Sequence, residues 1–83
     1  MTVYVIIGSG KRAVCVFSTR PQAEAFKNKF KQDAKRMREY CHIVESTEEQ
    51  NQFMDYFHTK WESQGINYAT RLSIQEVELN PTA

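Results

Sequence analysis

Residues 19–39 read TRPQAEAFKNKFKQDAKRMRE, and this segment carries the clearest structural signal in the chain. Five apolar residues recur in it at helical spacing: Ala23, Phe26, Phe30, Ala34 and Met37. At about 100° per residue they lie within about 80° of one another, which is the apolar stripe of an amphipathic helix. Thr19 and Gln22 have capping-box spacing, and Pro21 falls in the first turn, where helices tolerate proline. We therefore expect a helix over residues 20–39.

Two β-like runs precede this helix. Residues 3–7 and 13–17 are rich in β-branched and aromatic side chains, and the segment 8–12 between them contains two glycines. Glycine supplies the positive φ of a tight turn, so the pattern predicts an antiparallel hairpin. Side chains alternate along a strand. If Val3, Val5 and Ile7 face the core, the outward residues are Tyr4 and Ile6. Such an outward pair would indicate a second covered face or a partner.

The chain after residue 40 predicts a further strand and a second helix. Residues 41–45 form a short β-like run. Overlapping capping boxes then open the helix, pairing Ser46 with Glu49 and Thr47 with Gln50. An apolar stripe follows at helical spacing and consists of Phe53, Met54, Phe57 and Trp61. Gly65 is the expected end of this helix, because glycine adopts the left-handed conformation that terminates helices.

The last strand is expected within residues 68–79. Its apolar residues change sides midway, which predicts a bulge near Gln75 or Glu76. The resulting order is β-β-α-β-α-β. It predicts an α+β fold, in the form of a two-layer sandwich with a small mixed sheet and two helices on one face. We expect a single α+β domain over residues 1–79 and a frayed C-terminal tail at residues 80–83.

Composition argues against several classes of protein. The chain has only two cysteines, Cys15 and Cys41, which are too few for a disulfide scaffold. The apolar run near the first residue is too short for a signal peptide or a membrane span. We therefore expect a cytoplasmic protein with free thiols that does not act on a membrane.

The charge of the chain is divided along the sequence. Residues 1–38 hold nine basic and two acidic residues, a net charge of +7. Residues 39–83 hold two basic and eight acidic residues, a net charge of −6. The net charge of +1 conceals this division, which bears on the choice of partners.

Basic side chains gather at two places that predict a binding surface. Four flank the apolar stripe of the first helix and lie within about 80° of one another: they are Lys27, Lys31, Lys35 and Arg38. Lys11 and Arg12 lie in the 8–12 turn. A row of cations can follow the phosphates of a nucleic acid or another polyanion. It can also bind an acidic protein surface, including the acidic half of a second copy, or simply be a solvated face.

The sequence contains patterns that resemble catalytic and cofactor-binding motifs, but the elements predicted around them are not the ones that such sites require. Residues 8–13 fit the glycine pattern of dinucleotide-binding proteins, but a strand follows where that site requires a helix. Cys41 and His42 are adjacent, so on a strand they point to opposite faces and cannot share a metal. No carboxylate pair has a spacing that indicates acid–base catalysis. We expect no enzyme activity, no metal, no cofactor and no small-molecule substrate.

These observations predict a small non-catalytic interaction module, that is, an accessory, regulatory or inhibitor protein that binds another protein and forms a homodimer. Aromatic residues that lie off the predicted core stripes are expected at the interface: they are Tyr4, Tyr56 and Tyr68. The alternative is nucleic-acid or polyanion binding through the basic helix 20–39 and the 8–12 turn. The runs Val16–Phe26 and Ile74–Leu79 resemble passages common in small uncharacterised α+β proteins of bacteria and phages, a resemblance that assigns no family and no functional residue.

Overall fold

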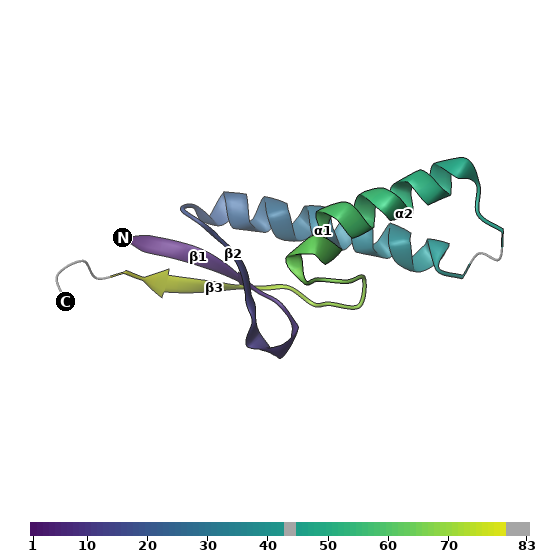
Figure 1. The fold of residues 1–83 in the computed structure, drawn as a ribbon. Coiled ribbons are helices and arrows are strands. Elements are labelled where there is room, and N and C mark those ends of the chain that lie inside the picture. The colour runs from purple at the N-terminus through teal and green to yellow at the C-terminus, as the bar shows by residue number, and fades with distance from the viewer. Residues whose placement is uncertain (43–44, 80–83) are drawn as a thin grey trace. The chain divides into compact units, whose positions relative to one another are not determined.

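The computed structural model describes residues 1–42 and 45–79 (Figure 1). Its elements, in chain order, are strand β1 (Thr2–Ile7), a 3-10 turn (Ser9–Lys11), strand β2 (Ala13–Phe17), helix α1 (Arg20–Tyr40), helix α2 (Glu48–Lys60), a second 3-10 turn (Glu62–Gln64) and strand β3 (Ser73–Glu78). The predicted α+β class is confirmed, because three antiparallel strands and two helices are the elements of a small two-layer protein.

The chain forms two compact units. The first comprises Met1–Asn28 with Arg71–Ala83, and the second comprises Lys29–Thr70. Helix α1 runs through the boundary between them. Each unit is therefore described by itself, and the single domain expected over residues 1–79 stays a prediction.

The sheet of the first unit has the order β2-β1-β3, so that β2 and β3 are both edge strands. The predicted hairpin of β1 and β2 is confirmed, and β3 also pairs with β1 in antiparallel fashion. The pairing of β3 with β1 is regular from Glu78 to Ser73, so the bulge expected in the last strand is wrong. The irregularity lies instead in the hairpin, between Ile6 and Ile7. No bulge is needed in β3 because its apolar residues serve both faces of the sheet.

The covered face of the sheet is the one that carries Tyr4 and Ile6. Ile6 is fully buried, and Phe17, the neighbour of Tyr4 on β2, packs on Phe26 of α1 with ring centroids 5.5 Å apart. Arg20 of α1 lies 5.3 Å from the Tyr4 ring centroid. The expected outward orientation of Tyr4 and Ile6 is therefore wrong. Phe17 explains the reversal, because its ring packs on Phe26 of the helix from the face that it shares with Tyr4 and Ile6.

The turn of the hairpin presents its basic residues to solvent. The Gly8 N–H donates to the Arg12 carbonyl at 2.8 Å, which closes the turn. Gly10 has φ of 74° and Lys11 has φ of 60°, so two consecutive residues adopt the left-handed region. Lys11 and Arg12 are both exposed.

Both predicted helices are confirmed. Helix α1 buries four of its five stripe residues, namely Ala23, Phe30, Ala34 and Met37. Helix α2 begins with the expected capping box, in which Thr47 accepts from the Gln50 N–H and the Gln50 side chain accepts from the Thr47 N–H. Of its own stripe, Phe57 and Trp61 are fully buried. Gly65 has the left-handed conformation, but it ends the 3-10 turn that follows α2 and not the helix itself.

The strand expected over residues 41–45 is wrong where the structure describes it. Cys41 and His42 form a turn, with the Cys41 N–H bonded to the Met37 carbonyl and the His42 N–H to the Glu39 carbonyl, as in a fraying helix end. Ile43 and Val44 of that prediction, and the tail expected at residues 80–83, lie outside the described residues. Without this strand the described sheet contains no parallel pair, so it is antiparallel and not mixed.

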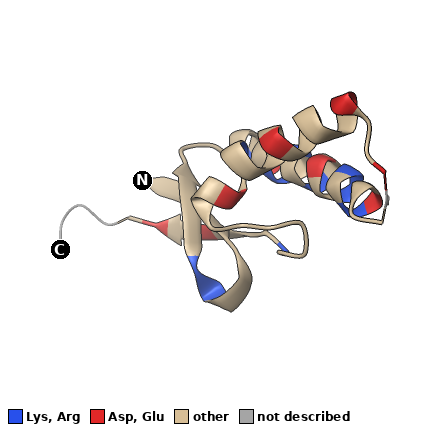
Figure 2. Cartoon of the chain, turned by 45° about the vertical axis from the view of Figure 1, so that its right-hand side comes forward, with Lys and Arg blue, Asp and Glu red and all other residues tan. Residues whose placement is uncertain are grey.

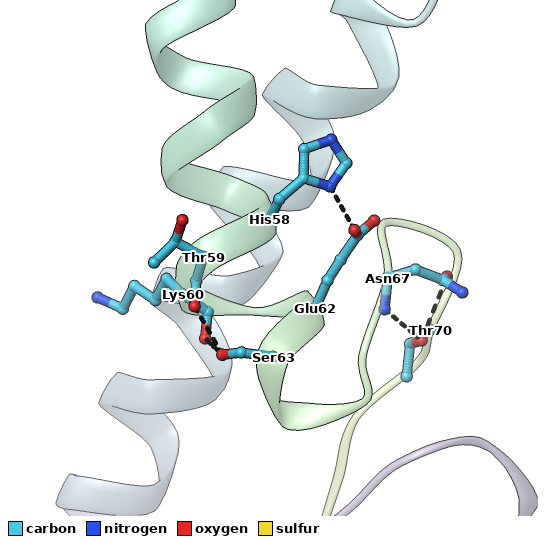
Figure 3. A network of polar contacts seen from close by, with 7 residues as sticks. All are labelled: His58, Thr59, Lys60, Glu62, Ser63, Asn67 and Thr70. Carbon is cyan, nitrogen blue, oxygen red and sulfur yellow. Dashed lines mark hydrogen bonds and ion pairs between the residues drawn. The ribbon is translucent and has the colours of Figure 1, made fainter.

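Polar contacts hold the chain that follows α2 (Figure 3). Ser63 Oγ donates to the Thr59 carbonyl at 2.6 Å, and His58 Nδ1 pairs with the Glu62 carboxylate one turn later. In the loop toward β3, the Asn67 N–H donates to Thr70 Oγ1 at 3.0 Å. Within residues 1–42 and 45–79, no helix combines the length and apolarity needed to cross a bilayer.

Candidate functional site

The second face of the sheet, which we call the open face, is apolar. Its membership follows from strand register, because residues directly opposite each other on paired strands point to the same side. Val5 lies opposite Val16 of β2, and Val3 lies opposite Val77 of β3. Met1 and Leu79 continue the pairing by one residue, with the Leu79 N–H bonded to the Met1 carbonyl at 2.6 Å. The apolar residues of the open face are thus Met1, Val3, Val5, Ile7, Val16, Val77 and Leu79.

Solvent reaches this face. The large apolar side chains that the described chain exposes are Met1 (78% exposed), Val16 (57%), Leu79 (48%) and Tyr56 (36%). The first three belong to the open face. A cluster of exposed apolar side chains on one surface is typical of an interaction site, whereas single ones are ordinary.

The open face also lacks charged side chains. The acids of β3 are Glu76 and Glu78, and both lie on the covered face, where Glu76 pairs with Arg20 at 3.5 Å and Glu78 accepts from Thr2 Oγ1 at 2.6 Å. Strand β2 has no charged residue at all. The polar side chains that alternation places on the open face of β3 are the neutral Ser73 and Gln75.

The predicted basic residues do not form one described site. Lys11, Arg12 and Lys27 belong to the first unit, and Lys31, Lys35 and Arg38 belong to the second. Figure 2 shows basic residues on α1 and at the hairpin turn, and acidic residues on α2. Arg38 donates from Nη2 to the Tyr68 carbonyl at 3.2 Å, so it fastens a loop of its own unit.

Lys31 and Lys35 both belong to the part of α1 in the second unit. Both are exposed. Within the described part of the chain, no carboxylate oxygen lies within ion-pair distance of Lys27, Lys31 or Lys35. The two lysines are one helical turn apart, which is a spacing that allows both to contact one anionic strand.

Asp33 is the important residue that sequence reasoning missed. It is only 5% exposed, and its carboxylate accepts hydrogen bonds from Tyr56 Oη at 2.7 Å and from Trp61 Nε1 at 2.9 Å. Lys29 Nζ lies 3.4 Å from the same carboxylate. One acid on α1 therefore binds an aromatic side chain of α2, Tyr56, and that of its C-cap residue, Trp61. A signal was present, because helical spacing places Asp33 about 20° from the edge of the apolar stripe.

Tyr56 is hydrogen-bonded to Asp33 and is also partly exposed. Burial, followed by the hydrogen bond to Asp33 and the charge of Asp33, raises the pKa of the Tyr56 phenol to about 12. The phenol therefore stays protonated at physiological pH and serves as a donor. Lys29 and Lys60 lie 6.0 Å and 5.6 Å from its ring centroid. Tyr56 is thus partly exposed and has two cations over its ring.

The other two predicted interface aromatics have different surroundings. Tyr4 is half-buried on the covered face of the sheet under Arg20. Tyr68 is half-buried in its loop, where its carbonyl accepts from Arg38. Of the three, Tyr56 is the exposed one.

The thiols and histidines supply little reactive chemistry. Burial raises the pKa of the Cys15 thiol, which disfavours the nucleophilic thiolate. Cys41 is exposed in the turn after α1. Among the residues that the structure describes, no three His, Cys, Asp or Glu side chains are grouped closely enough to hold a metal ion.

Comparisons with known proteins give no relative for this chain. No protein-family model matches it, and neither a curated protein nor a solved structure does.

Proposed function

We propose that this protein is a non-catalytic interaction module that acts by protein–protein binding through the open face. The observation that carries the proposal is that Met1, Val16 and Leu79, all well exposed, lie on the one side of the sheet that has no charged side chain. Apolar area of this kind gains free energy when a partner removes it from water. Val16 lies on a paired strand, and a backbone hydrogen bond joins Met1 and Leu79 one residue beyond β1 and β3, which lowers the entropy cost of ordering these positions on binding.

Site-specific photo-crosslinking in cells tests this proposal. A photo-reactive aromatic residue placed at position 16 should form a covalent adduct with a protein partner, because Val16 points out of the open face. The same residue at position 25 is the matched control, since Ala25 is exposed on α1 within the same unit. An adduct at position 16 that exceeds the control supports the proposal. Equal or absent adducts at the two positions would refute it.

Polyanion binding through Lys31 and Lys35 is the second candidate. It is favoured by their exposure and by the lack of a described carboxylate at ion-pair distance. We expect the affinity for a single-stranded oligonucleotide to fall about 7-fold between about 50 and 200 mM salt, the loss that two phosphate contacts give. The double variant Lys31→Glu/Lys35→Glu should abolish the binding, whereas Lys60→Glu on α2 should leave most of it. Fluorescence anisotropy measures both, and no binding at low salt rejects this candidate.

A further inference from the structure

We infer that the free edge of β2 binds an extended segment of a partner protein as a fourth strand, which runs antiparallel to β2 and carries acidic residues at its C-terminal end. The inference rests on the proposed function and names the part of the partner that is recognised. Three observations support it: the direction of the backbone groups of β2, the absence of charge along that strand, and the two cations that precede it.

The hydrogen bonds between β1 and β3 show which way each backbone group of β1 points. Met1 and Leu79 form a bonded pair, since the Leu79 N–H donates to the Met1 carbonyl at 2.6 Å and the Met1 amino group donates to the Leu79 carbonyl at 3.1 Å. Bonded and non-bonded pairs alternate along antiparallel strands. The pairing is regular up to Ile7, so Val5 and Gln75 are a bonded pair, and the N–H and carbonyl of Val5 point toward β3.

Val16 of β2 consequently directs its own backbone groups away from β1. It lies opposite Val5, whose N–H and carbonyl are used by β3, so these two valines are a non-bonded pair. The irregularity of the hairpin lies between Ile6 and Ile7, and the pairing is regular at Val16. The N–H and the carbonyl of Val16 therefore face the free edge, where a further strand can accept from the first and donate to the second.

The side chains of β2 favour an uncharged partner segment. The strand has no charged residue, and Val16 is 57% exposed. A strand added at this edge sets its own side chains beside Val16 on the open face and beside Phe17 on the covered face. Both neighbours are apolar, so β-branched residues in the partner segment pack best against them.

Two cations determine the direction of the incoming strand. Lys11 and Arg12 are exposed immediately before β2 (Figure 2), and no carboxylate that the structure describes lies within ion-pair distance of either. An antiparallel strand ends where β2 begins. Acidic residues at the C-terminal end of the partner segment therefore come close to both cations, and their charges are complementary.

The same cations disfavour other occupants of the edge. Two β2 strands paired about Val16 would bring Arg12 of each copy toward Arg20 of the other, and the Arg20 side chain is 50% exposed. Like charges that face each other across a strand pair repel, which disfavours a second copy. A nucleic acid supplies anions but not the alternating backbone donors and acceptors that extend a sheet. An acidic extended peptide supplies both.

Titration of the purified full chain with a synthetic peptide tests the inference. The probe is a capped peptide in which valine and threonine alternate and two glutamates follow at the C-terminal end. Heteronuclear NMR follows binding up to about 1 mM peptide, a concentration that detects weak complexes. The exchange of the Val16 amide hydrogen with solvent should slow about 5-fold or more near saturation, because the probe accepts from it. Moving the two glutamates to the N-terminal end of the probe should raise the dissociation constant about 3-fold.

A proline variant removes the backbone donor on which this binding depends. Edge strands tolerate proline where its missing N–H would face solvent, so Val16→Pro should fold while its ring keeps the open face apolar. The dissociation constant for the probe should rise about 5-fold. Val16→Thr is the matched control, because it keeps the N–H and a β-branched side chain, and it should stay within about 2-fold of the unaltered chain. Should Val16→Pro fail to fold by circular dichroism, the exchange of the Val16 amide in the unaltered chain decides.

The outcomes separate this inference from the proposed function. The edge inference is overturned if the probe does not bind at about 1 mM, or if it binds without slowing the Val16 exchange or without loss in a folded Val16→Pro variant. An affinity that ignores the position of the glutamates refutes the assigned direction. If position 16 still forms an adduct in cells, the proposed function stands and the partner contacts side chains of the open face alone. If the probe binds as expected and the adduct is absent, the edge inference stands and the proposed function fails.

Discussion

Replacement of Phe30 by alanine should lower the free energy of unfolding by about 3–5 kcal/mol. Phe30 is 3% exposed and is the aromatic centre of the second unit. Its ring lies 5.1 Å from the Trp61 ring and 6.3 Å from the Phe57 ring, measured between centroids. Alanine removes these contacts and leaves a cavity that the two fully buried neighbours cannot fill without moving.

Urea denaturation followed by far-ultraviolet circular dichroism measures this loss. Lys31→Ala is the matched control, because Lys31 is the next residue of α1 and is exposed. It should change the unfolding free energy by less than about 0.5 kcal/mol. A loss under about 1 kcal/mol for Phe30→Ala would contradict the described aromatic core.

Replacement of Asp33 by alanine should cost about 3 kcal/mol, the second-largest effect that we expect. The variant removes the one carboxylate that accepts from both Tyr56 Oη and Trp61 Nε1. Hydrogen bonds to a buried charged group are stronger than neutral ones, and Asp33 is 5% exposed. Asp33→Asn should cost less, because the amide oxygen still accepts although the charge is gone.

Trp61 is the one tryptophan of the chain, so its fluorescence reports on this contact directly. Asp33→Ala should shift the emission of the folded protein and lower the denaturation midpoint. Asp55→Ala removes the same charge from an exposed position of α2 and should do neither. An unchanged emission spectrum in the folded Asp33→Ala variant would show that the carboxylate does not bind the indole N–H.

The elements of the fold could largely be predicted from local signals. The stripe of α1 and the capping box of Thr47 depend on residues within one or two turns, and both helices were found where these signals place them. The signals that predict the hairpin, two β-like runs around a turn with two glycines, also lie close together in the sequence. The strand expected at residues 41–45 was predicted wrongly, because β-propensity reflects packing against neighbouring residues that the sequence does not show. Cys41 and His42 continue the hydrogen bonding of α1 instead.

The sides of the sheet could not be predicted in the same way. Alternation in β1 separates Val3 and Val5 from Tyr4 and Ile6, but it does not say which pair meets the helix. That choice depends on Phe17 of β2, which lies opposite Tyr4 and packs on Phe26. From the sequence alone, Val3 and Val5 of the open face were therefore predicted to be core residues. Asp33 was hidden for a related reason, since its role depends on two residues more than 20 positions away.

The two edges of the sheet differ in a way that limits how far molecules can assemble. Edge strands are the usual starting points of fibrils, because their free backbone groups accept a further strand. Edge strand β3 carries Glu76 and Glu78, so antiparallel addition of another β3 would set carboxylates near carboxylates. Only the β2 edge has no such protection. Even if strands were to join there, the new ribbon would end in acidic edges on both sides, and its growth would stop at a finite particle.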